Sequence, residues 1–238
     1  GDCCGGGAAV RTLTIADPAL VGSVRKSLLQ EVMADGPQTL WIGNDGAGAP
    51  QDSSGNSRHL TLANGSNTYA SDGTYGTVLD MSSGSWTTTF RCPQSAYTLE
   101  AWIRLSTNVS GDACPIGDWG GNNAFGAMML LTSSSNALLA YHRGSTNSGG
   151  NLSTGTWYHL AQTWNGSTVR LYLNGSEVGT PISTSTAPGT ANGSGLSRVS
   201  SYGGVATGRR VPGQGRFIAW YSSALSGSRI AAHRAAGV

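Results

Sequence analysis

Two Asn-Gly dipeptides, Asn165-Gly166 and Asn174-Gly175, constrain the fold of this chain more than any other feature. Asn-Gly accepts the positive φ that both central residues of a two-residue hairpin turn require. Between the two turns, Val169–Leu173 alternates apolar and polar residues, which is the pattern of a half-buried strand. Three strands joined by two tight turns form an antiparallel meander. We therefore expect an all-β fold.

The composition narrows the class of protein. A length of 238 residues suits one large β domain or a domain plus an arm, and 36 glycines are typical of many short strands joined by turns. Charged residues make up only 11% and the formal net charge is +2, whereas a nucleic-acid binder needs a basic surface. No apolar run approaches the roughly 20 residues of a membrane-spanning helix. The sequence predicts neither a nucleic-acid partner nor a membrane span.

The N-terminal region differs from the rest of the chain. Residues 1–16 contain a flexible glycine run and a short strand-like segment, which is typical of an arm. Residues 17–35 predict one amphipathic helix, with Asp17 as the N-cap and Pro18 at the first helical position. We expect residues 1–36 to anchor the chain to a partner and residues 37–238 to form the β domain. The alternative is a helix that plugs one end of that domain.

The best-patterned strand is Tyr97–Leu105, in which every odd-numbered residue is apolar. The polar stretch Ser183–Ser201 predicts a loop, and Ser226 is a good N-cap for a short C-terminal helix over Gly227–Ala236. Further strands are expected at Thr39–Ile42, His59–Leu62, Thr77–Met81, Phe125–Thr132, Ala137–Arg143 and Phe217–Tyr221.

Three segments resemble the laminin-G-like branch of the concanavalin A-like jelly rolls: YTLEAWIRL at 97–105, GTWYHLAQTWNGSTVRLYL at 155–173 and WYSSALSGSRIAAHRAAG at 220–237. The resemblance implies a two-sheet antiparallel jelly-roll sandwich. It also implies binding of glycans or proteins at loops of one rim or across the concave sheet, in some members with calcium. The final strand of such proteins often opens with an acidic pair, whereas this chain has Arg216-Phe217. A site built on those carboxylates is therefore not expected.

The acidic residues argue against an enzyme. A retaining glycosidase needs two carboxylates about 5–5.5 Å apart, which alternate positions on one strand could supply. None of the three glutamates, Glu31, Glu100 and Glu177, has an acidic residue two positions away. Glu100 is expected to form a cross-strand salt bridge or to lie on the sheet surface, and the four histidines are interpreted as isolated structural residues. A hydrolase or lyase with an unrecognised site is the alternative.

Glycan binding requires an aromatic platform and planar hydrogen-bonding groups. One loop supplies an aromatic ring and two amides, a following loop supplies an imidazole and a guanidinium, and a third segment supplies another ring. These candidates are Trp119, Asn122, Asn123, His142, Arg143 and Tyr202. In the alternative interpretation Trp119 covers the edge of the core and the asparagines form turns.

Calcium is the one cofactor that the sequence leaves open. Loop carboxylates would supply its ligands, although no Asp-x-Asp-x-Asp loop is present. The candidates are Asp45, Asp52, Asp112 and Asp118. Cys92 and Cys114 flank the strand Tyr97–Leu105 and are either a disulfide or two independent thiols.

The hypothesis from sequence is a structural protein of a bacteriophage virion, on the tail or the capsid surface. It would reinforce the particle or touch a host-surface glycan, form a homo-oligomer and contact other virion proteins through residues 1–36. The alternative is a carbohydrate-binding module of a secreted bacterial protein. Both hypotheses place the protein outside the cell.

Overall fold

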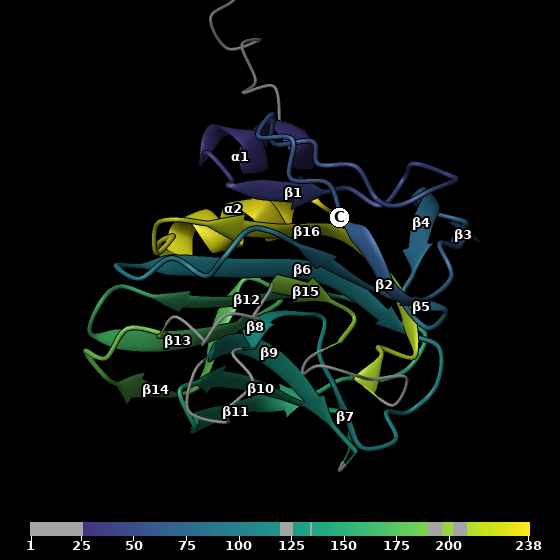
Figure 1. The fold of residues 1–238 in the computed structure, drawn as a ribbon. Coiled ribbons are helices and arrows are strands. Elements are labelled where there is room, and N and C mark those ends of the chain that lie inside the picture. The colour runs from purple at the N-terminus through teal and green to yellow at the C-terminus, as the bar shows by residue number, and fades with distance from the viewer. Residues whose placement is uncertain (1–25, 120–125, 134, 190–196, 202–208) are drawn as a thin grey trace, which may run out of the picture.

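The computed structural model describes residues 26–119, 126–133, 135–189, 197–201 and 209–238. Two antiparallel sheets lie face to face, which confirms the expected jelly-roll sandwich (Figure 1). Sheet A has the strand order β14-β13-β12-β6-β16-β4-β3, with β1 also paired to β16. Sheet B has the order β11-β10-β9-β8-β15-β5-β2, with β7 also paired to β9.

The strands are short and numerous, as the glycine content suggested. Sheet A contains β1 (Thr39–Trp41), β3 (Tyr69–Asp72), β4 (Gly76–Asp80), β6 (Tyr97–Leu105), β12 (Trp157–Trp164), β13 (Thr168–Leu173), β14 (Ser176–Ser183) and β16 (Gly213–Tyr221). Sheet B contains β2 (Thr61–Gly65), β5 (Gly84–Thr88), β7 (Asp112–Ala113), β8 (Ile116–Trp119), β9 (Gly126–Thr132), β10 (Ala137–His142), β11 (Ser145–Asn151) and β15 (Ser197–Val199).

The expected meander is β12-β13-β14, but only its second turn has the predicted form. Asn174 and Gly175 have φ values of 52° and 83° and join β13 to β14 directly. The first turn contains three residues, 165–167, and Asn165 does not have a positive φ. Instead, the Asn165 side-chain oxygen accepts hydrogen bonds from the backbone N–H groups of Ser167 and Thr168, which closes the turn in another way.

The core between the sheets is built around β6. Tyr97, Leu99 and Ile103 point inward from this strand and are fully buried with the large side chains of Trp86 and Trp220. The intervening residues Thr98, Glu100 and Trp102 of β6 face away from sheet B and are also buried. Sheet A is therefore covered on both faces over its central strand.

The two helices supply that second cover. The α1 helix (Leu28–Ala34) contacts α2 (Gly227–Ala236), and buried Leu28 and Val32 share a cluster with Ile230. Figure 1 shows α1 beside β1 and α2 beside β16. The part of the N-terminal helix that is described is thus packed on its own β domain. None of the helices in the described residues has both the length and the apolar character needed to cross a membrane.

The helix expected over residues 17–35 is not continuous, because Lys26 and Ser27 are not helical and α1 begins at Leu28. Ser27 is the N-cap, with extended ψ of 159°, and forms a capping box with Gln30 that starts a new helix. Residues 17–25 lie outside the described part of the chain, as does the arm. The C-terminal helix has the predicted bounds, with Ser226 as its N-cap and Gly237 as its C-cap.

The segment Ser183–Ser201 is not entirely a loop, because its end forms β15 between β5 and β8. The last strand is also longer than expected: β16 begins at Gly213, before the predicted Phe217. The glycines at 213 and 215 had hidden its strand pattern, since glycine is a poor strand former.

Candidate functional site

Strand β16 changes its hydrogen-bonding partner halfway along one edge. Gln214 and Gly215 pair with β4, whereas Ile218, Ala219 and Trp220 pair with β1. On the opposite edge, the register with β6 shifts between Arg216 and Ala219, which marks a β-bulge. The bulge therefore lies at the junction of four strands of sheet A.

Phe217 occupies the bulge with a φ of 45°. This left-handed conformation is rare for a bulky residue, and such outliers gather at functional sites. The Phe217 N–H donates a hydrogen bond to the carbonyl oxygen of Ile42, 3.2 Å away, so the end of β1 holds the unusual backbone in place. Both Phe217 and its neighbour Arg216 lie beside aromatic residues on the helix-covered face of sheet A.

The guanidinium of Arg216 sits in a cage of aromatic rings. Its central carbon is 3.5 Å from the ring centroid of Tyr75, 5.3 Å from those of Trp102 and Phe217, and 6.0 Å from that of Trp157. These are cation–π distances. Burial lowers the pKa of Arg216, with nearby Tyr75 and Asp72 opposing it, but an arginine remains protonated at neutral pH.

The Arg216 side chain is positively charged, yet among the described residues it has neither a hydrogen-bond acceptor nor a carboxylate as its partner. Only 7% of the residue is exposed, and its Nε is buried without a hydrogen bond. Within the described residues, no carboxylate approaches its guanidinium to 4.0 Å. Asp72, the acidic residue nearby, instead accepts hydrogen bonds from Arg104 at 2.7 Å and Trp157 Nε1 at 2.9 Å.

A pocket of about 230 Å³ opens at this junction, which we call the Arg216 pocket. Its walls include an aromatic ring, a guanidinium, an amide and apolar groups from α1, β16 and the segments beside β1 and β4. The residues used below are Leu29, Ile42, Asn44, Tyr75, Arg216 and Phe217. An apolar ring next to planar polar groups is the combination that recognises a sugar, whose faces are apolar and whose edges carry hydroxyls.

The residues predicted to bind glycan lie elsewhere, on sheet B. Trp119 pairs with Gly126, and Ala127 pairs with His142, so the end of β8, the start of β9 and the end of β10 lie together at one end of the sheet. His142 is only 1% exposed there, with its Nδ1 2.8 Å from the Tyr97 hydroxyl, and so has no surface for a ligand. Arg143 NH1 donates to the Ala187 carbonyl oxygen. Asn122, Asn123 and Tyr202 lie outside the described residues.

The four aspartates proposed as calcium ligands have separate protein partners. Asp45 accepts a hydrogen bond from Gln51 N. Asp52 accepts hydrogen bonds from the backbone N–H groups of Leu40, Ser54 and Arg58 and from the Ser54 hydroxyl. Asp112 pairs with Arg209, and Asp118 accepts from Cys92 N and Arg91. No group of three potential metal ligands occurs among the described residues. These aspartates therefore close loops and strand ends.

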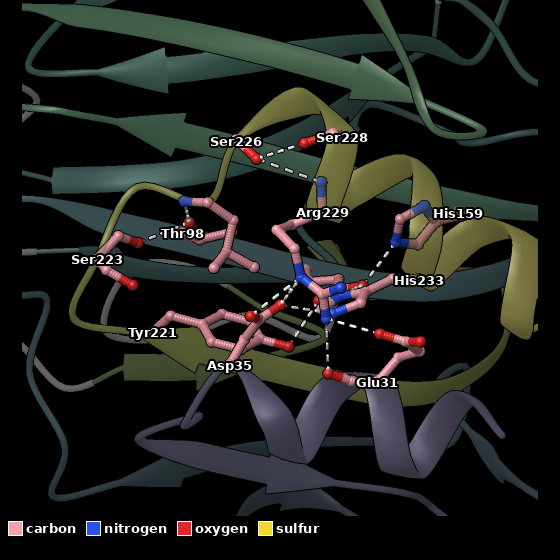
Figure 2. A network of polar contacts seen from close by, with 12 residues as sticks. Glu31, Asp35, Thr98, His159, Tyr221, Ser223, Ser226, Ser228, Arg229 and His233 are labelled. Carbon is pink, nitrogen blue, oxygen red and sulfur yellow. Dashed lines mark hydrogen bonds and ion pairs between the residues drawn. The ribbon is translucent and has the colours of Figure 1, made fainter. Parts of the chain in front are cut away.

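A buried polar network lies on the same face of sheet A, between α1 and α2 (Figure 2). Its centre is Glu100, which is 1% exposed, so the expectation of a sheet-surface carboxylate was wrong. The other expectation, a cross-strand salt bridge, is confirmed by the contact of Glu100 on β6 with His159 on the neighbouring strand β12. Glu100 receives contacts from His159 Nε2 at 2.7 Å, the Tyr221 hydroxyl at 2.7 Å and His233 Nδ1 at 3.0 Å. Their separation in the sequence had suggested that His159 and His233 are isolated, but the structure brings both to the same carboxylate.

The network continues to α1. His233 Nε2 lies 2.9 Å from Asp35 Oδ2, at an ion-pair distance without hydrogen-bond geometry. Arg229 binds Asp35 at 2.9 Å and Glu31 at 2.7 Å, and Figure 2 shows both carboxylates reaching from α1 toward α2. Polar residues at these positions therefore fasten the helices to each other and to β6.

The protonation states follow from the contacts. Burial alone would raise the pKa of Glu100, but hydrogen bonds from His159 and His233 outweigh it and hold that pKa well below its usual range. Burial alone would lower the pKa of His233, yet Glu100 and Asp35 raise it above 6.5. The geometry suits a charged structural pair rather than a site that substrate enters.

The comparisons with known proteins agree with the architecture. A family model described as the concanavalin A-like lectin/glucanases superfamily matches residues 54–231. No curated protein matches the sequence. Domain 4 of an extracellular arabinanase from Geobacillus stearothermophilus, solved with arabinotriose, is 16% identical with a TM-score of 0.59; the match covers 77% of this chain and 91% of that domain.

Two further solved structures are similar over only part of their length. The binding domain of botulinum neurotoxin DC, solved with SialylT, is 16% identical with a TM-score of 0.58; the match covers 84% of this chain and 51% of the toxin domain. A sialidase of Trypanosoma rangeli, solved with 2,3-difluorosialic acid, is 12% identical with a TM-score of 0.58 and is covered over 32% of its length, against 81% of this chain. At these identities the likeness shows the fold alone.

Proposed function

The chain belongs to the concanavalin A-like lectin/glucanases superfamily, and on this premise we propose that it is a non-catalytic domain that binds a glycan in the Arg216 pocket. The observation that carries the proposal is the bulge in β16, which holds Phe217 in a strained conformation beside Arg216 at the pocket wall. Strain of this kind costs on the order of 1–3 kcal/mol and persists where the surrounding structure enforces it. A role of Phe217 in ligand binding explains why the chain keeps this strained backbone.

The pocket chemistry supports a saccharide. The half-buried ring of Phe217 offers a face for stacking, and the exposed amide of Asn44 offers a donor and an acceptor for hydroxyl groups. The volume lies below the roughly 300–1,000 Å³ of pockets for drug-sized ligands, which suits a single sugar residue at the end or side of a chain. Three of the similar structures were themselves solved with saccharides or a sugar analogue.

The polar network supports the non-catalytic part of the proposal. Glu100 has neighbours that could serve acid–base chemistry, but it is 1% exposed and bound by three protein groups. A general acid must come within hydrogen-bond reach of a substrate atom. Packing beneath α2 prevents such an approach.

The test is retention on immobilised polysaccharides, followed by titration with oligosaccharides of the retained type. We expect Asn44→Ala and Phe217→Gly to weaken binding at least about tenfold, as loss of a stacking ring or a polar anchor does. Arg143→Ala is the comparison, because it alters the sheet-B rim that the sequence indicated. Loss of binding in Arg143→Ala alone would move the site to that rim, and no retention of the wild-type protein on any polysaccharide would contradict the proposal.

We also propose the setting in which this binding acts: the exterior of a bacteriophage particle, on the tail or the capsid, with a module of a secreted bacterial protein as the alternative. The supporting observation is that α1 leaves Leu29 and Met33 about 40% and 39% exposed, next to residues 1–25 that precede it. Deleting residues 1–25 keeps Glu31 and Asp35 and hence the fold. That deletion should abolish co-sedimentation with the particle yet preserve glycan binding; unchanged co-sedimentation would count against an anchoring role.

A further inference from the structure

The charge balance around the Arg216 pocket is uneven. Asp72 and Arg104 form an ion pair at 2.7 Å, with side chains 1% and 32% exposed. Hydrogen bonds from Trp157 and the backbone of Thr74 and Tyr75, together with Arg104, overcome the effect of burial and lower the pKa of Asp72. That carboxylate is therefore ionised and already neutralised. The positive charge of Arg216 therefore has no carboxylate left to balance it among the described residues.

The hydrogen-bond donors of the Arg216 guanidinium also have no acceptor among the described residues. A guanidinium has five N–H donors in a planar fork and no acceptor. Within the described residues the Arg216 side chain makes no hydrogen bond, although the residue is more than nine-tenths buried and lines the pocket. The aromatic rings compensate part of the charge but accept none of these protons. A buried polar group without partners is costly, and a ligand that supplies acceptors would remove the cost.

We propose that the Arg216 pocket selects an acidic sugar and binds its carboxylate through the Arg216 guanidinium. This inference rests on the proposed function and names the ligand class of the same site. A carboxylate is planar and matches the fork with two parallel hydrogen bonds. Because Arg216 is the one cation among the described residues that line the pocket, a group with a single negative charge balances it, whereas a doubly charged phosphate would leave an excess charge among aromatic rings. The Phe217 face would then hold the ring of the same sugar.

The experiment uses the full chain and three simple probes: D-glucuronate, D-glucose and D-glucose 6-sulfate. Binding at about pH 6, where glucuronate is ionised, is followed in ¹⁵N–¹H spectra that include the arginine Nε–Hε signals. We expect glucuronate to shift the Arg216 signal and to bind at least about tenfold more tightly than glucose, because hydrogen bonds between charged groups are about twice as strong as neutral ones. Glucose 6-sulfate should bind more weakly than glucuronate, because a sulfate ester is a weaker base than a carboxylate and therefore a weaker hydrogen-bond acceptor.

Two variants complete the test. Arg216→Gln should abolish the preference for glucuronate over glucose, whereas Arg170→Gln, which removes an exposed arginine on β13, should preserve it. Should Arg216→Gln fail to fold, the wild-type comparison of the three probes still decides the matter.

The outcomes separate the inference from the function on which it rests. Equal binding of glucuronate and glucose at the pocket would overturn the acidic-sugar assignment and leave glycan binding standing. Binding of the sulfate as tight as that of glucuronate would overturn the carboxylate assignment. If none of the three sugars shifts any pocket signal, the acidic-sugar assignment is overturned, and retention on the polysaccharide panel then decides whether glycan binding at another site stands.

Discussion

The Nδ1 atom of His233 lies 3.0 Å from both carboxylate oxygens of Glu100, and this contact joins the C-terminal helix to β6. Neither residue reaches solvent. Since Asp35 of the N-terminal segment approaches the other ring nitrogen of His233, one imidazole links the two ends of the described chain. The first two predictions concern this contact.

Glu100→Gln should lower the free energy of unfolding by about 3 kcal/mol or more, because it leaves His233 as a buried cation without its main counter-charge. Chemical denaturation measures the difference. Glu177→Gln is the matched control, since Glu177 pairs with Arg170 at an exposed site, and exposed pairs contribute about 1 kcal/mol or less. Equal losses in the two variants would show that the Glu100 pair is not a buried charge pair.

The stabilisation that comes from the Glu100–His233 pair should have its maximum between about pH 4.5 and 6.5, the ordinary values for a glutamate and a histidine. His233 has a raised pKa in the folded state, so its contribution is fully present below pH 6.5 and is lost as the pH rises through the folded value. Glu100 has a lowered folded pKa, so its contribution is present above pH 4.5 and is lost as the pH falls. Thermal unfolding across this range, with His233→Gln as a comparison, checks the signs: the variant should lose the alkaline decline. A decline unchanged in His233→Gln would assign it to another group.

Gly213→Ala should destabilise the protein severely, because a methyl group at this position would collide with the backbone carbonyl of Arg104 on the paired strand β6. Backbone atoms cannot move aside as a flexible side chain can, and overpacking typically costs about 1–3 kcal/mol or more. Gly73→Ala is the control, since nothing lies within 4 Å of the place that a methyl group would take there. The two urea midpoints should differ clearly, and coincident midpoints would mean that β16 shifts at little cost.

Phe217→Gly should retain more stability than Phe217→Ala, by about 1 kcal/mol, although both lose the same ring contacts. Glycine adopts the φ of 45° without strain, whereas alanine keeps the cost of the left-handed conformation. Both variants should lose glycan binding, because the ring is absent in each. Urea denaturation together with the polysaccharide assay separates the two effects. An alanine variant as stable as the glycine variant would argue that the bulge is unstrained.

Cys92 and Cys114 should resist alkylation in the native protein. Both are buried and free, which resolves the choice that the sequence left open, and burial raises the pKa of each thiol. The thiolate is the reactive form, so both effects slow the reaction. Iodoacetamide labelling followed by peptide mass mapping should find these two positions modified only in denaturant. Modification under native conditions would reveal local opening of β8 or of the segment before β6.

The sequence predicted best where local rules suffice. The alternation in Tyr97–Leu105, the cap at Ser226 and the turn at Asn174-Gly175 all operate over a few residues, and all are confirmed. The prediction of one continuous helix over residues 17–35 was wrong because the apolar pattern hid the cap at Ser27, whose partner Gln30 lay within the predicted helix. Strand β15 was missed because three residues inside a polar stretch have no pattern, and the strands on either side define it.

The Arg216 pocket could not be predicted from local sequence patterns. Arg216 was noticed only for departing from an acidic pair, and its pocket depends on Tyr75, Asn44 and Leu29, which are far from it in the chain. Likewise, nothing in the spacing of Glu100, His159 and His233 indicates that sheet pairing and a helix bring them together. Predictions about such clusters require the topology first.

Strand β16 is synthesised after all the other described strands but occupies the middle of sheet A, between β6 on one edge and β4 and β1 on the other. A ribosome that has not yet released residues 213–221 therefore carries two half-sheets with open edges and a Glu100 that lacks its tyrosine and helical histidine partners. Unpaired edges and long-range closure slow folding and invite aggregation. Folding of this domain must thus wait for its final strand, and a chain that stops before residue 213 should give insoluble protein rather than a shortened folded domain.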